Sequence, residues 1–289
     1  MTSREAQQYC TDLAKRSGSN FYYSFFFLPP DRRKAMHAVY AFCREVDSTV
    51  DDPAPGSDPR ARLARWREDV AALYRTDGAA PPNAQSPVIV CLADHIRQLD
   101  IPRQYWDEII AGVEMDLTIA RYATFRDLYQ YCYRVAAVVG LVCLKIFGAR
   151  TKEAQDYAIN LGVAFQLTNI LRDLKTDGAR GRIYLPAEDL ARFGYREDEL
   201  LGGAYTPAFV SLMEFECRRT QDYYRAAEAA LPDADRRALL PAEIMRAIYH
   251  TILTRIETAR YQVFARRITL SPPHRLAVAL GAWLKNASG

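Results

Sequence analysis

Several features that mark large classes of protein are scarce or missing from this sequence of 289 residues. The net charge is only +3 and the basic residues are spread along the chain, so nucleic acid is not an expected partner. There is no Cys-x-x-Cys pair and no zinc-like spacing between the cysteines and the four histidines, which argues against a structural zinc site. We expect free thiols, typical of a reducing cytoplasm, at Cys10, Cys43, Cys91, Cys132, Cys143 and Cys217.

The sequence also has little that resembles a membrane or export signal. Residues 1–13 are polar and lack the apolar core of a signal peptide. The longest apolar run, residues 135–144, is shorter than the ~20 residues that a membrane-spanning helix needs. We expect a soluble cytoplasmic protein, with at most a peripheral contact on the inner face of the membrane.

Strand-like alternation is almost absent, and helical periodicity takes its place. Between Pro30 and Pro53, for example, apolar residues recur every three or four positions. There is no repeat and no low-complexity segment. The expected helices are 31–50, 60–74, 102–121, 125–147, 152–174, 206–230, 235–268 and 273–284, and the expected breaks are 53–59, 76–87 and 178–186. This pattern predicts one all-α domain over residues 1–289, a helical bundle with its site in the centre.

Two acidic motifs share one spacing. Asp47 and Asp51 are four residues apart, and so are Asp173 and Asp177. On a helix, residues at this spacing lie on one face with Cβ atoms ~5–6 Å apart. Two such helices facing each other would form an anionic site that suits Mg²⁺, because this ion takes a few carboxylate oxygens and leaves the rest of its shell to water and substrate phosphates. The motifs therefore predict Mg²⁺-dependent diphosphate chemistry.

The neighbours of each pair support a site, although one Asp-x-x-x-Asp on a helix is usually only a solvated face. Tyr40 and Arg44 precede the first pair at helical spacing, so they can share its face. Gln166, Asn169 and Arg172 continue one polar stripe beside the strongly apolar residues 161–171. Burying so many polar groups is costly unless they are paired or bind a metal. The two-motif site is therefore the favoured interpretation.

With these residues, the chain resembles the squalene/phytoene synthase family over residues 17–267, nearly its whole length. The two acidic motifs carry the likeness together with YCYRVAAVVG (131–140) and RGRIYLP (180–186). Any one of these would be weak evidence, but four in this order are specific. The resemblance implies the all-α isoprenoid synthase fold and a prenyltransferase that joins two prenyl diphosphates head to head.

Two further segments suggest a finer assignment within the family. SNFYYSFFFLPP (19–30) and AFCREVD (41–47) look most like bacterial enzymes that condense two farnesyl diphosphates to presqualene diphosphate. This resemblance implies farnesyl diphosphate as the substrate, with enzymes of squalene and hopanoid synthesis downstream. The alternatives are phytoene or dehydrosqualene synthase of carotenoid synthesis, and squalene synthase using NADPH. NADPH is not expected, because no Gly-rich dinucleotide fingerprint is present.

The resemblance also implies ligands for metal and diphosphate. Mg²⁺, with Mn²⁺ as a substitute, would take up charge that develops on the leaving oxygen. Its expected ligands are Asp47, Asp51, Asp173 and Asp177. The expected diphosphate contacts are the arginines Arg44, Arg172, Arg182 and Arg266, which present fork-like donors, and the amides Gln166 and Asn169.

Aromatic residues are expected to shield the allylic cation that remains after the diphosphate leaves. Cation–π contacts are worth roughly 0.5–2 kcal/mol each. The candidates for this wall are Phe21, Phe25, Tyr40, Tyr131 and Phe165. Proton loss then closes a ring, assisted by Tyr131, Tyr184, Tyr249 or the released diphosphate, and the sequence does not choose among them.

Other classes of protein fit these residues less well. Head-to-tail chain elongation uses two Asp-Asp-x-x-Asp motifs, and a helical di-iron oxidase uses Glu-x-x-His, which does not occur here. A non-catalytic helical lipid-binding scaffold would not need the acidic pairs together with Arg44, Asn169 and Arg172.

A few single residues complete the expectations. Glu114 and Asp116 are two apart and do not share a helix face, so we expect structural roles for both, and likewise for His37 and His250. Ala137 stands where the family often has glycine, and its extra volume is expected to shape the prenyl tunnel.

Overall fold

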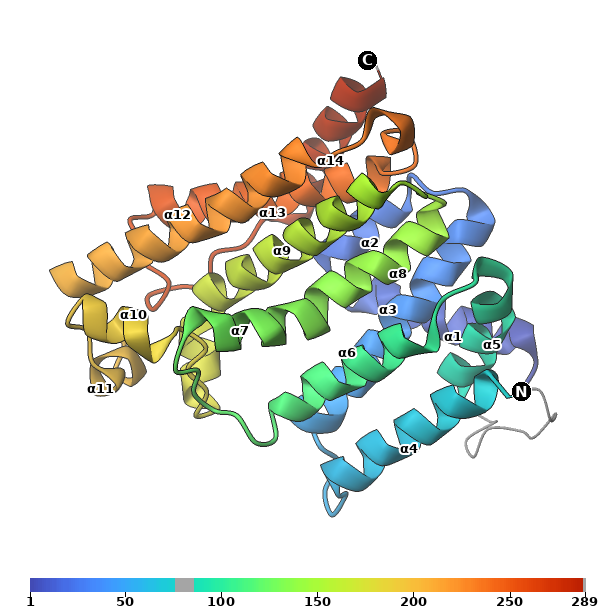
Figure 1. Cartoon of the computed structure of the whole chain (residues 1–289), viewed down its shortest axis with the longest axis horizontal. Coiled ribbons are helices and arrows are strands. Elements are labelled where there is room, and N and C mark those ends of the chain that lie inside the picture. Colours follow the sequence, from blue (N-terminus) through green and yellow to red (C-terminus); the bar gives the residue numbers. More distant parts are fainter. Residues whose placement is uncertain (76–85, 288–289) are drawn as a thin grey trace.

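The computed structural model describes residues 1–75 and 86–287, and every regular element within them is a helix (Figure 1). The long helix α9 lies at the centre, where it contacts α8, α12 and α13. The helices are α1 (Ser3–Arg16), α2 (Asn20–Phe25), α3 (Pro30–Asp51), α4 (Pro59–Leu73), α5 (Pro87–Leu99), α6 (Arg103–Met115), α7 (Phe125–Cys132), α8 (Val138–Phe147), α9 (Lys152–Ala179), α10 (Ala187–Arg192), α11 (Glu197–Leu201), α12 (Pro207–Ala229), α13 (Leu240–Thr258) and α14 (Pro272–Ala287). The all-α prediction is confirmed.

Helices α3 and α9 place both acidic motifs near helix C-termini. Pro30 starts α3 and Asp51 is its last residue, with Pro53 just beyond. The Thr151 hydroxyl caps α9 by accepting a hydrogen bond from the Ala154 amide, and the helix runs to Ala179. It therefore extends past the expected end at residue 174 and carries the whole second motif.

The expected helix 125–147 is continuous but contains one wide turn. Residues Tyr133–Ala137 form a π turn between α7 and α8. At this turn α9 crosses very closely, because a Cβ on Gly162 would lie 2.5 Å from the Ala137 Cα. Ala137 is fully buried in this crossing. The expectation that Ala137 shapes the tunnel is therefore wrong, since its volume is used to pack two helices.

Two expected helices end earlier than the pattern indicated. Helix 102–121 stops at Met115, because the chain turns and then pairs in an isolated β-bridge between Arg121 and Ile183. The pattern over 235–268 also fails at both ends. Asp235 lies in a short 3₁₀ turn, and its carboxylate accepts the Thr151 hydroxyl at 2.7 Å.

The other end of the 235–268 pattern is set by the backbone. Helix α13 begins only at Leu240, with Pro241 in its first turn, and ends at Thr258. Arg260 and Tyr261 follow with φ of 51° and 63°, which is incompatible with a continuing helix. Helices α1, α2, α5, α10 and α11 were not expected. The expected break 76–87 lies almost entirely outside the described residues.

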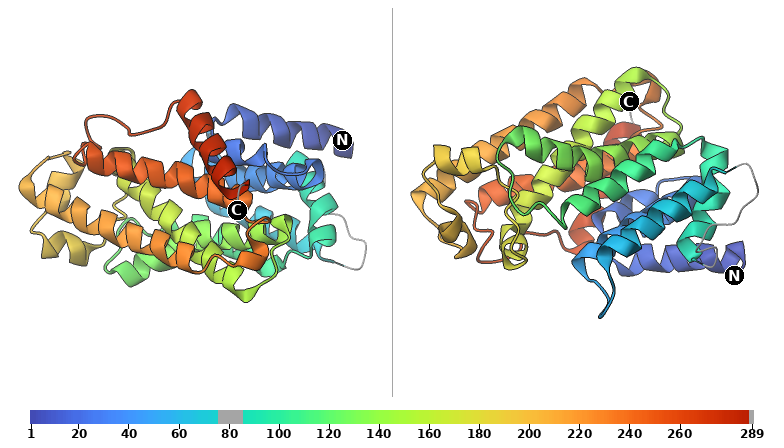
Figure 2. Two further views of the ribbon diagram at one scale, coloured as in Figure 1. Left: turned by 90° about the horizontal axis from the view of Figure 1, so that it is seen from above. Right: turned by 60° about the horizontal axis from the view of Figure 1, so that its bottom comes forward.

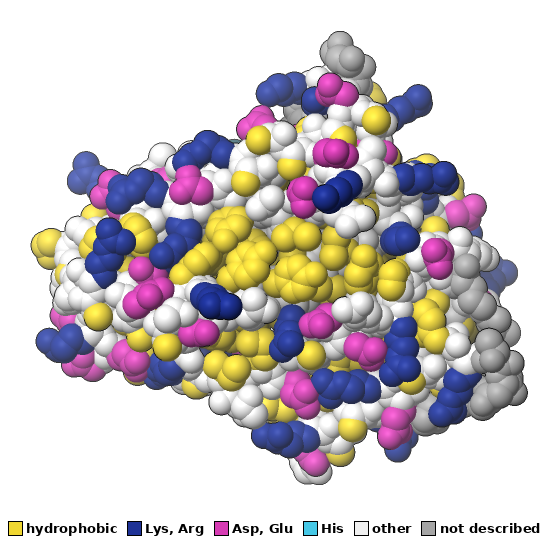
Figure 3. Space-filling view, in the orientation of Figure 1, with side chains coloured by type: hydrophobic (Ala, Val, Ile, Leu, Met, Phe, Trp, Pro, Cys, Tyr) yellow, Lys and Arg dark blue, Asp and Glu magenta, His cyan; other side chains and the backbone are white. Residues whose placement is uncertain are grey.

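Apolar side chains gather across the centre of one face, over the seam between α12 and α7–α8 (Figure 3). The rings of Phe125 and Tyr129 on α7 each contact the ring of Tyr223 on α12. The stretch Phe125–Phe147 is long and apolar enough to cross a membrane by length and composition, unlike the shorter run considered from sequence. Half of the most apolar 18-residue window in that stretch is buried inside the bundle, and a core helix passes the same test, so this is weak evidence for a span.

Candidate active site

Two adjoining cavities lie among the helices that carry the motifs. The first, called here the acidic cleft, has a volume of about 510 Å³ and includes Asp47, Asp51, Asp116, Asp173 and Asp177 in its lining. The second, called here the apolar cavity, has a volume of about 310 Å³ and is lined mainly by apolar residues of α2, α3, α8 and α9. The lining residues common to both are Arg44, Asp47, Val135, Gln166 and Asn169. A polar chamber therefore joins an apolar one.

The first and second acidic pairs concentrate negative charge in the cleft. Both lie close to the C-terminal end of a helix, where the macrodipole is also negative. Burial and the neighbouring Asp51 raise the pKa of Asp47 to about 7, although its side chain is solvent-accessible from the cleft. Burial and Asp173 likewise raise the pKa of Asp177 to about 7. The cleft is therefore suited to binding cations.

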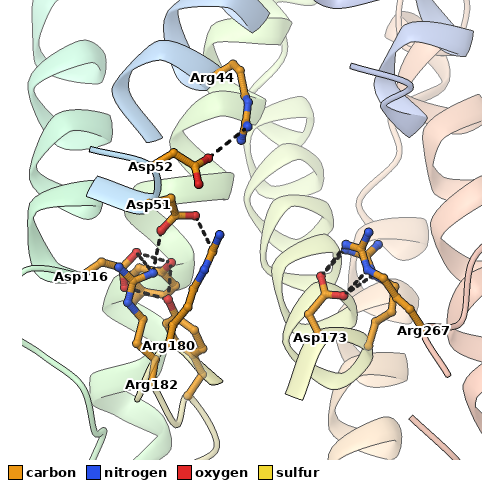
Figure 4. A network of polar contacts seen from close by, with 11 residues as sticks. Arg44, Asp51, Asp52, Asp116, Asp173, Arg180, Arg182 and Arg267 are labelled. Atoms are coloured by element: carbon orange, nitrogen blue, oxygen red, sulfur yellow. Dashed lines mark hydrogen bonds and ion pairs between the residues drawn. The ribbon is translucent and has the colours of Figure 1, made fainter. Parts of the chain in front are cut away.

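Arginines contact the other carboxylate of each pair from opposite sides of the cleft (Figure 4). Asp51 accepts hydrogen bonds from Arg182 at 2.7 Å and Arg180 at 2.8 Å. Across the cleft, Asp173 accepts a two-pronged contact from Arg267, at 2.7 and 3.0 Å, and a second from Arg172. Burial alone would raise the pKa of Asp173, but these hydrogen bonds outweigh it and hold the pKa below its usual value.

Asp116 is the centre of a third cluster, which the sequence did not suggest. Its carboxylate accepts hydrogen bonds from the Tyr131 hydroxyl at 3.0 Å and the Tyr184 hydroxyl at 2.8 Å. The hydroxyl oxygens of Tyr131 and Tyr184 lie 3.3 Å apart, and the two rings stack at 5.0 Å. Burial and the charge of Asp116 raise the pKa of both tyrosines. Both phenols are therefore held protonated, as hydrogen-bond donors.

The residues of the cleft fit a divalent cation that prefers oxygen ligands. The available donors are carboxylates and the Asn169 amide oxygen, which is buried and has no hydrogen-bond partner in the structure. Such oxygen donors suit Mg²⁺ and Mn²⁺. Among the described residues no three acidic side chains are already close enough together to hold an ion. Three of these side chains would therefore have to move closer together to hold one ion jointly.

Aromatic rings lie along the apolar cavity. Phe21, Phe25, Tyr40 and Phe165 line it, and Phe21 meets Phe165 edge to face at 6.5 Å. Tyr249 lines neither cavity; it supports the wall from behind, stacked on Phe165 at 4.5 Å. The arrangement can enclose a hydrocarbon chain and keep water from it.

The structure brings the expected site residues together with two exceptions. Asp47, Asp51, Asp173, Asp177, Tyr131, Tyr184, Arg172, Tyr40, Arg44, Asn169, Arg182, Phe21, Phe25, Gln166 and Phe165 each line at least one cavity. Tyr249 and Arg266 line neither. Arg266 was expected to contact the diphosphate but is exposed, and its neighbour Arg267 instead lines the acidic cleft and contacts Asp173.

Sequence reasoning missed Asp116, Arg180 and Arg267. Asp116 was interpreted as structural because it follows Glu114 by two positions, but it lies just past the end of α6, where helical faces no longer apply. Arg180 stands in the RGRIYLP segment and could have been found there. Arg267 lies in an irregular segment next to another arginine, so no periodic signal separates the two.

Comparison with known proteins identifies the family. A family model described as squalene/phytoene synthase matches residues 14–274. The 15-cis-phytoene synthase of Synechocystis sp. is 37% identical over 97% of this chain and 85% of its own length. The 15-cis-phytoene synthase of Synechococcus elongatus is 34% identical over 91% of this chain and 87% of its own length.

Solved structures agree with the fold. A dehydrosqualene synthase in complex with ligand superposes with a TM-score of 0.86, at 26% identity over 99% of this chain and 98% of the other. The squalene synthase HpnC from Alicyclobacillus acidocaldarius superposes with a TM-score of 0.79, at 26% identity over 90% of this chain and 95% of the other. The expected isoprenoid synthase fold is confirmed.

The finer expectation from sequence is contradicted. Presqualene diphosphate formation from farnesyl diphosphate was expected, but the curated relatives from cyanobacteria and plants are named phytoene synthases. The segments 19–30 and 41–47 are too short to separate branches of one family, which explains the error. Together, the family match, the identities and the superpositions show that the chain is a prenyltransferase and belongs to the squalene/phytoene synthase family.

Proposed function

We propose that this chain is a phytoene synthase, which condenses two geranylgeranyl diphosphates head to head. The observation that carries the proposal is the likeness to proteins of that name at 34–37% identity over nearly the whole chain. The acidic cleft that joins an apolar cavity supports it, because a prenyl diphosphate has one anionic end and one long apolar end. Members of this family generally depend on divalent metals and use prenyl diphosphates.

In this proposal the cleft binds the two diphosphates. Arg44, Arg172, Arg180, Arg182 and Arg267 surround it, and all but Arg44 already hold a carboxylate of the two acidic pairs. When substrate enters, these guanidinium groups would exchange carboxylate for phosphate oxygens, which offer the same paired acceptors.

Asp47, Asp51, Asp173 and Asp177, with the Asn169 oxygen, would then hold Mg²⁺ or Mn²⁺. The bound metal would supply Lewis-acid stabilisation of charge on the leaving diphosphate. The ring faces of Phe21, Phe25, Tyr40 and Phe165 would exclude water from the allylic cation and stabilise it.

The cluster of Asp116, Tyr131 and Tyr184 suggests which group accepts the proton that is lost during the reaction. Tyr131 and Tyr184 were candidate bases, but their raised pKa values keep them protonated and make them donors. Asp116 accepts from both and faces the cleft, so it is the better candidate to accept or relay a proton. Replacing Asp116 by Asn should therefore lower kcat by about 10²-fold or more, the usual scale of general acid–base catalysis.

Product analysis tests the proposal. Purified protein is given Mg²⁺ with geranylgeranyl diphosphate, farnesyl diphosphate or both, with and without NADPH. We expect phytoene from geranylgeranyl diphosphate, and no change in product when NADPH is added. If the protein converts farnesyl diphosphate to dehydrosqualene or squalene but does not convert geranylgeranyl diphosphate, the proposed chain length of the substrate is wrong. The Asp173→Asn variant is the control and should form no product.

A cytoplasmic location of the protein stays a prediction.

A further inference from the structure

A buried ion cluster lies outside both cavities, where α10 meets α12 next to the start of α7 at one end of the molecule (Figure 2). Arg219 of α12 donates hydrogen bonds to Asp189 of α10 at 2.7 and 3.3 Å, and to Glu216, three residues earlier on α12, at 3.0 and 2.9 Å. Its guanidinium also lies 4.1 Å from the centroid of the Phe125 ring and 4.7 Å from that of Phe215. We call these five residues the Arg219 clamp.

The clamp joins the two chain segments that carry the stacked tyrosines of the cleft. Phe125 is the first residue of α7, and Tyr131 lies on the same helix six residues later. Tyr184 precedes Asp189 by five residues, and Asp189 lies on α10. Because Arg219 contacts both Phe125 and Asp189, it fixes the start of one segment relative to the other.

Near the clamp the two segments are irregular, and hydrogen bonds join them to each other. Residues 116–124 and 180–186 contain no helix. The carboxylate of Glu188 accepts the Phe125 amide at 2.6 Å. Three backbone hydrogen bonds run between the segments, from the amides of Ile183, Ala187 and Glu188 to the carbonyls of Ala120, Tyr122 and Ala123, at 3.0, 2.9 and 3.1 Å. A shift of α10 at the clamp would therefore move Tyr184 as well, because no helix holds this segment in place.

The clamp also depends on each of its charged members. Asp189 and Glu216 are only 3% and 2% exposed, and in the described part of the chain Arg219 is the one cation paired with either carboxylate. Removing one partner of a buried ion pair leaves an uncompensated charge, which is strongly destabilising. Without Arg219, the carboxylate of Asp189 would therefore turn toward water and draw its segment away from α12.

We propose that the Arg219 clamp places Tyr184 beside Tyr131, so that both hydroxyls donate to the same carboxylate in the cleft. That carboxylate, of Asp116, accepts them at 2.8 and 3.0 Å, and a shifted segment would break such short contacts. Arg219 is then a positioning residue that acts on the reaction from outside both cavities. The inference rests on the proposed function for its effect on turnover, since Asp116 is the proton acceptor proposed above.

A double-mutant cycle on kcat tests this proposal. Arg219→Gln removes the positive charge of the clamp and Tyr184→Phe removes the hydroxyl that the clamp positions. We expect each to lower kcat about tenfold, the scale of one lost hydrogen bond. The double variant should also lose about tenfold, because Arg219 acts through Tyr184, whereas independent effects would multiply to about a hundredfold. Arg219→Lys keeps the positive charge and should recover most of the activity.

Hydrogen exchange of the full chain without substrate tests the position of the segment directly. The three backbone amides that join the two segments should exchange at least about tenfold faster in Arg219→Gln, because their hydrogen bonds open more often. They should exchange at the parent's rate in Tyr184→Phe, which leaves the clamp intact. Asp189→Asn should act in the same direction as Arg219→Gln, and it takes the place of that variant in both experiments if Arg219→Gln does not fold.

Asp235→Asn is the matched control for Asp189→Asn. Asp235 is also buried, at 9% exposure, but it lies beyond the C-terminal end of α12, where it accepts the Thr151 hydroxyl. Its replacement removes a buried carboxylate of the same kind without touching the clamp. This variant should change neither kcat nor the exchange of the three amides.

Four outcomes would overturn the proposal. They are an undiminished kcat in Tyr184→Phe, losses in kcat that multiply in the double variant, unchanged exchange of the three amides in the clamp variants, or equal effects of Asp235→Asn and Asp189→Asn. The value of kcat is measured with whichever prenyl diphosphate the parent converts, and hydrogen exchange needs no substrate. A failure of the clamp is therefore distinguishable from a failure of the phytoene synthase assignment.

Discussion

At the scale of single residues, the cleft holds its own counter-charges. Asp51 and Asp173 are neutralised by arginines, while Asp47 and Asp177 have raised pKa values and no such direct partner. The same side chains that would bind metal and diphosphate thus contact each other before either arrives. Sequence spacing predicted the carboxylates well, because i and i+4 on a helix is a rigid relation. Sequence spacing could not predict which arginine contacts the cleft where the chain is irregular, as at Arg266 and Arg267.

Arg267 and Arg266 are adjacent, so replacing each in turn tests which of the two arginines acts on the substrate. We expect Arg267→Gln to raise KM for the prenyl diphosphate about 10- to 100-fold, the scale of a lost charge-assisted hydrogen bond. Arg266→Gln removes the same charge one residue earlier and should change KM less than about twofold, because Arg266 is exposed and lines neither cavity. Steady-state kinetics measure both, and equal effects would mean that only net charge matters.

The raised pKa of Asp177 predicts how the stability of the folded protein depends on pH. Its pKa in the folded protein is about 7, raised from 3.8. Between these values the folded state binds a proton that the unfolded state has lost, so the unfolding free energy falls as pH rises through this window. Asp177→Asn should therefore unfold at a higher temperature than the parent at pH 8 without metal, and at a similar temperature at pH 4.

Thermal unfolding with and without Mg²⁺ checks this. Mg²⁺ should stabilise the parent at pH 8 more than Asp177→Asn, since the ion offsets the unfavourable carboxylate. Asp233→Asn, at a carboxylate that is 92% exposed and lines neither cavity, is the control and should show neither effect. A lower unfolding temperature for Asp177→Asn at pH 8 would contradict the direction of the pKa shift.

At the scale of elements, close helix contacts position the site. The π turn Tyr133–Ala137 follows Tyr131 and precedes α8, and α9 crosses it at Gly162. This crossing holds the helix of Asp173 and Asp177 against the helix of Tyr131. Periodicity predicted α3, α4, α9 and α12, whose apolar stripes are long. It failed over 235–268, where Asp235 and the backbone at Arg260 and Tyr261 interrupt the helix without changing the apolar spacing.

Gly162→Ala tests the importance of that crossing. The new Cβ would lie 2.5 Å from the Ala137 Cα and 2.7 Å from its backbone nitrogen, so the helices must separate. We expect a loss of about 1–3 kcal/mol in the free energy of unfolding, as for other overpacked cores. Gly281→Ala in α14 is the matched control, since nothing lies within 4 Å of its added Cβ. It should gain up to about 1 kcal/mol from helix propensity. Urea unfolding measures both, and equal changes would sink the packing argument.

At the scale of the whole molecule, the two cavities form one site only because segments far apart in sequence meet. Residues of α2, α3, α8 and α9 surround the apolar cavity, and the segment 180–184 completes the cleft. The sequence indicated this assembly through motif order, which carries no information on the substrate's chain length. That is why the family was predicted and the farnesyl substrate was wrong. A single domain over residues 1–289 stays a prediction, supported by one continuous cluster of buried apolar side chains.

The central claim is that one prenyl diphosphate spans both cavities. A crystal structure with Mg²⁺ and a non-hydrolysable geranylgeranyl diphosphate analogue tests it most directly. We predict the diphosphate between the two acidic pairs, with Arg182 and Arg267 moved from Asp51 and Asp173 onto phosphate oxygens, and the tail along Phe21 and Phe165. A tail outside the apolar cavity, or arginines still bound to both aspartates beside a bound diphosphate, would contradict the account.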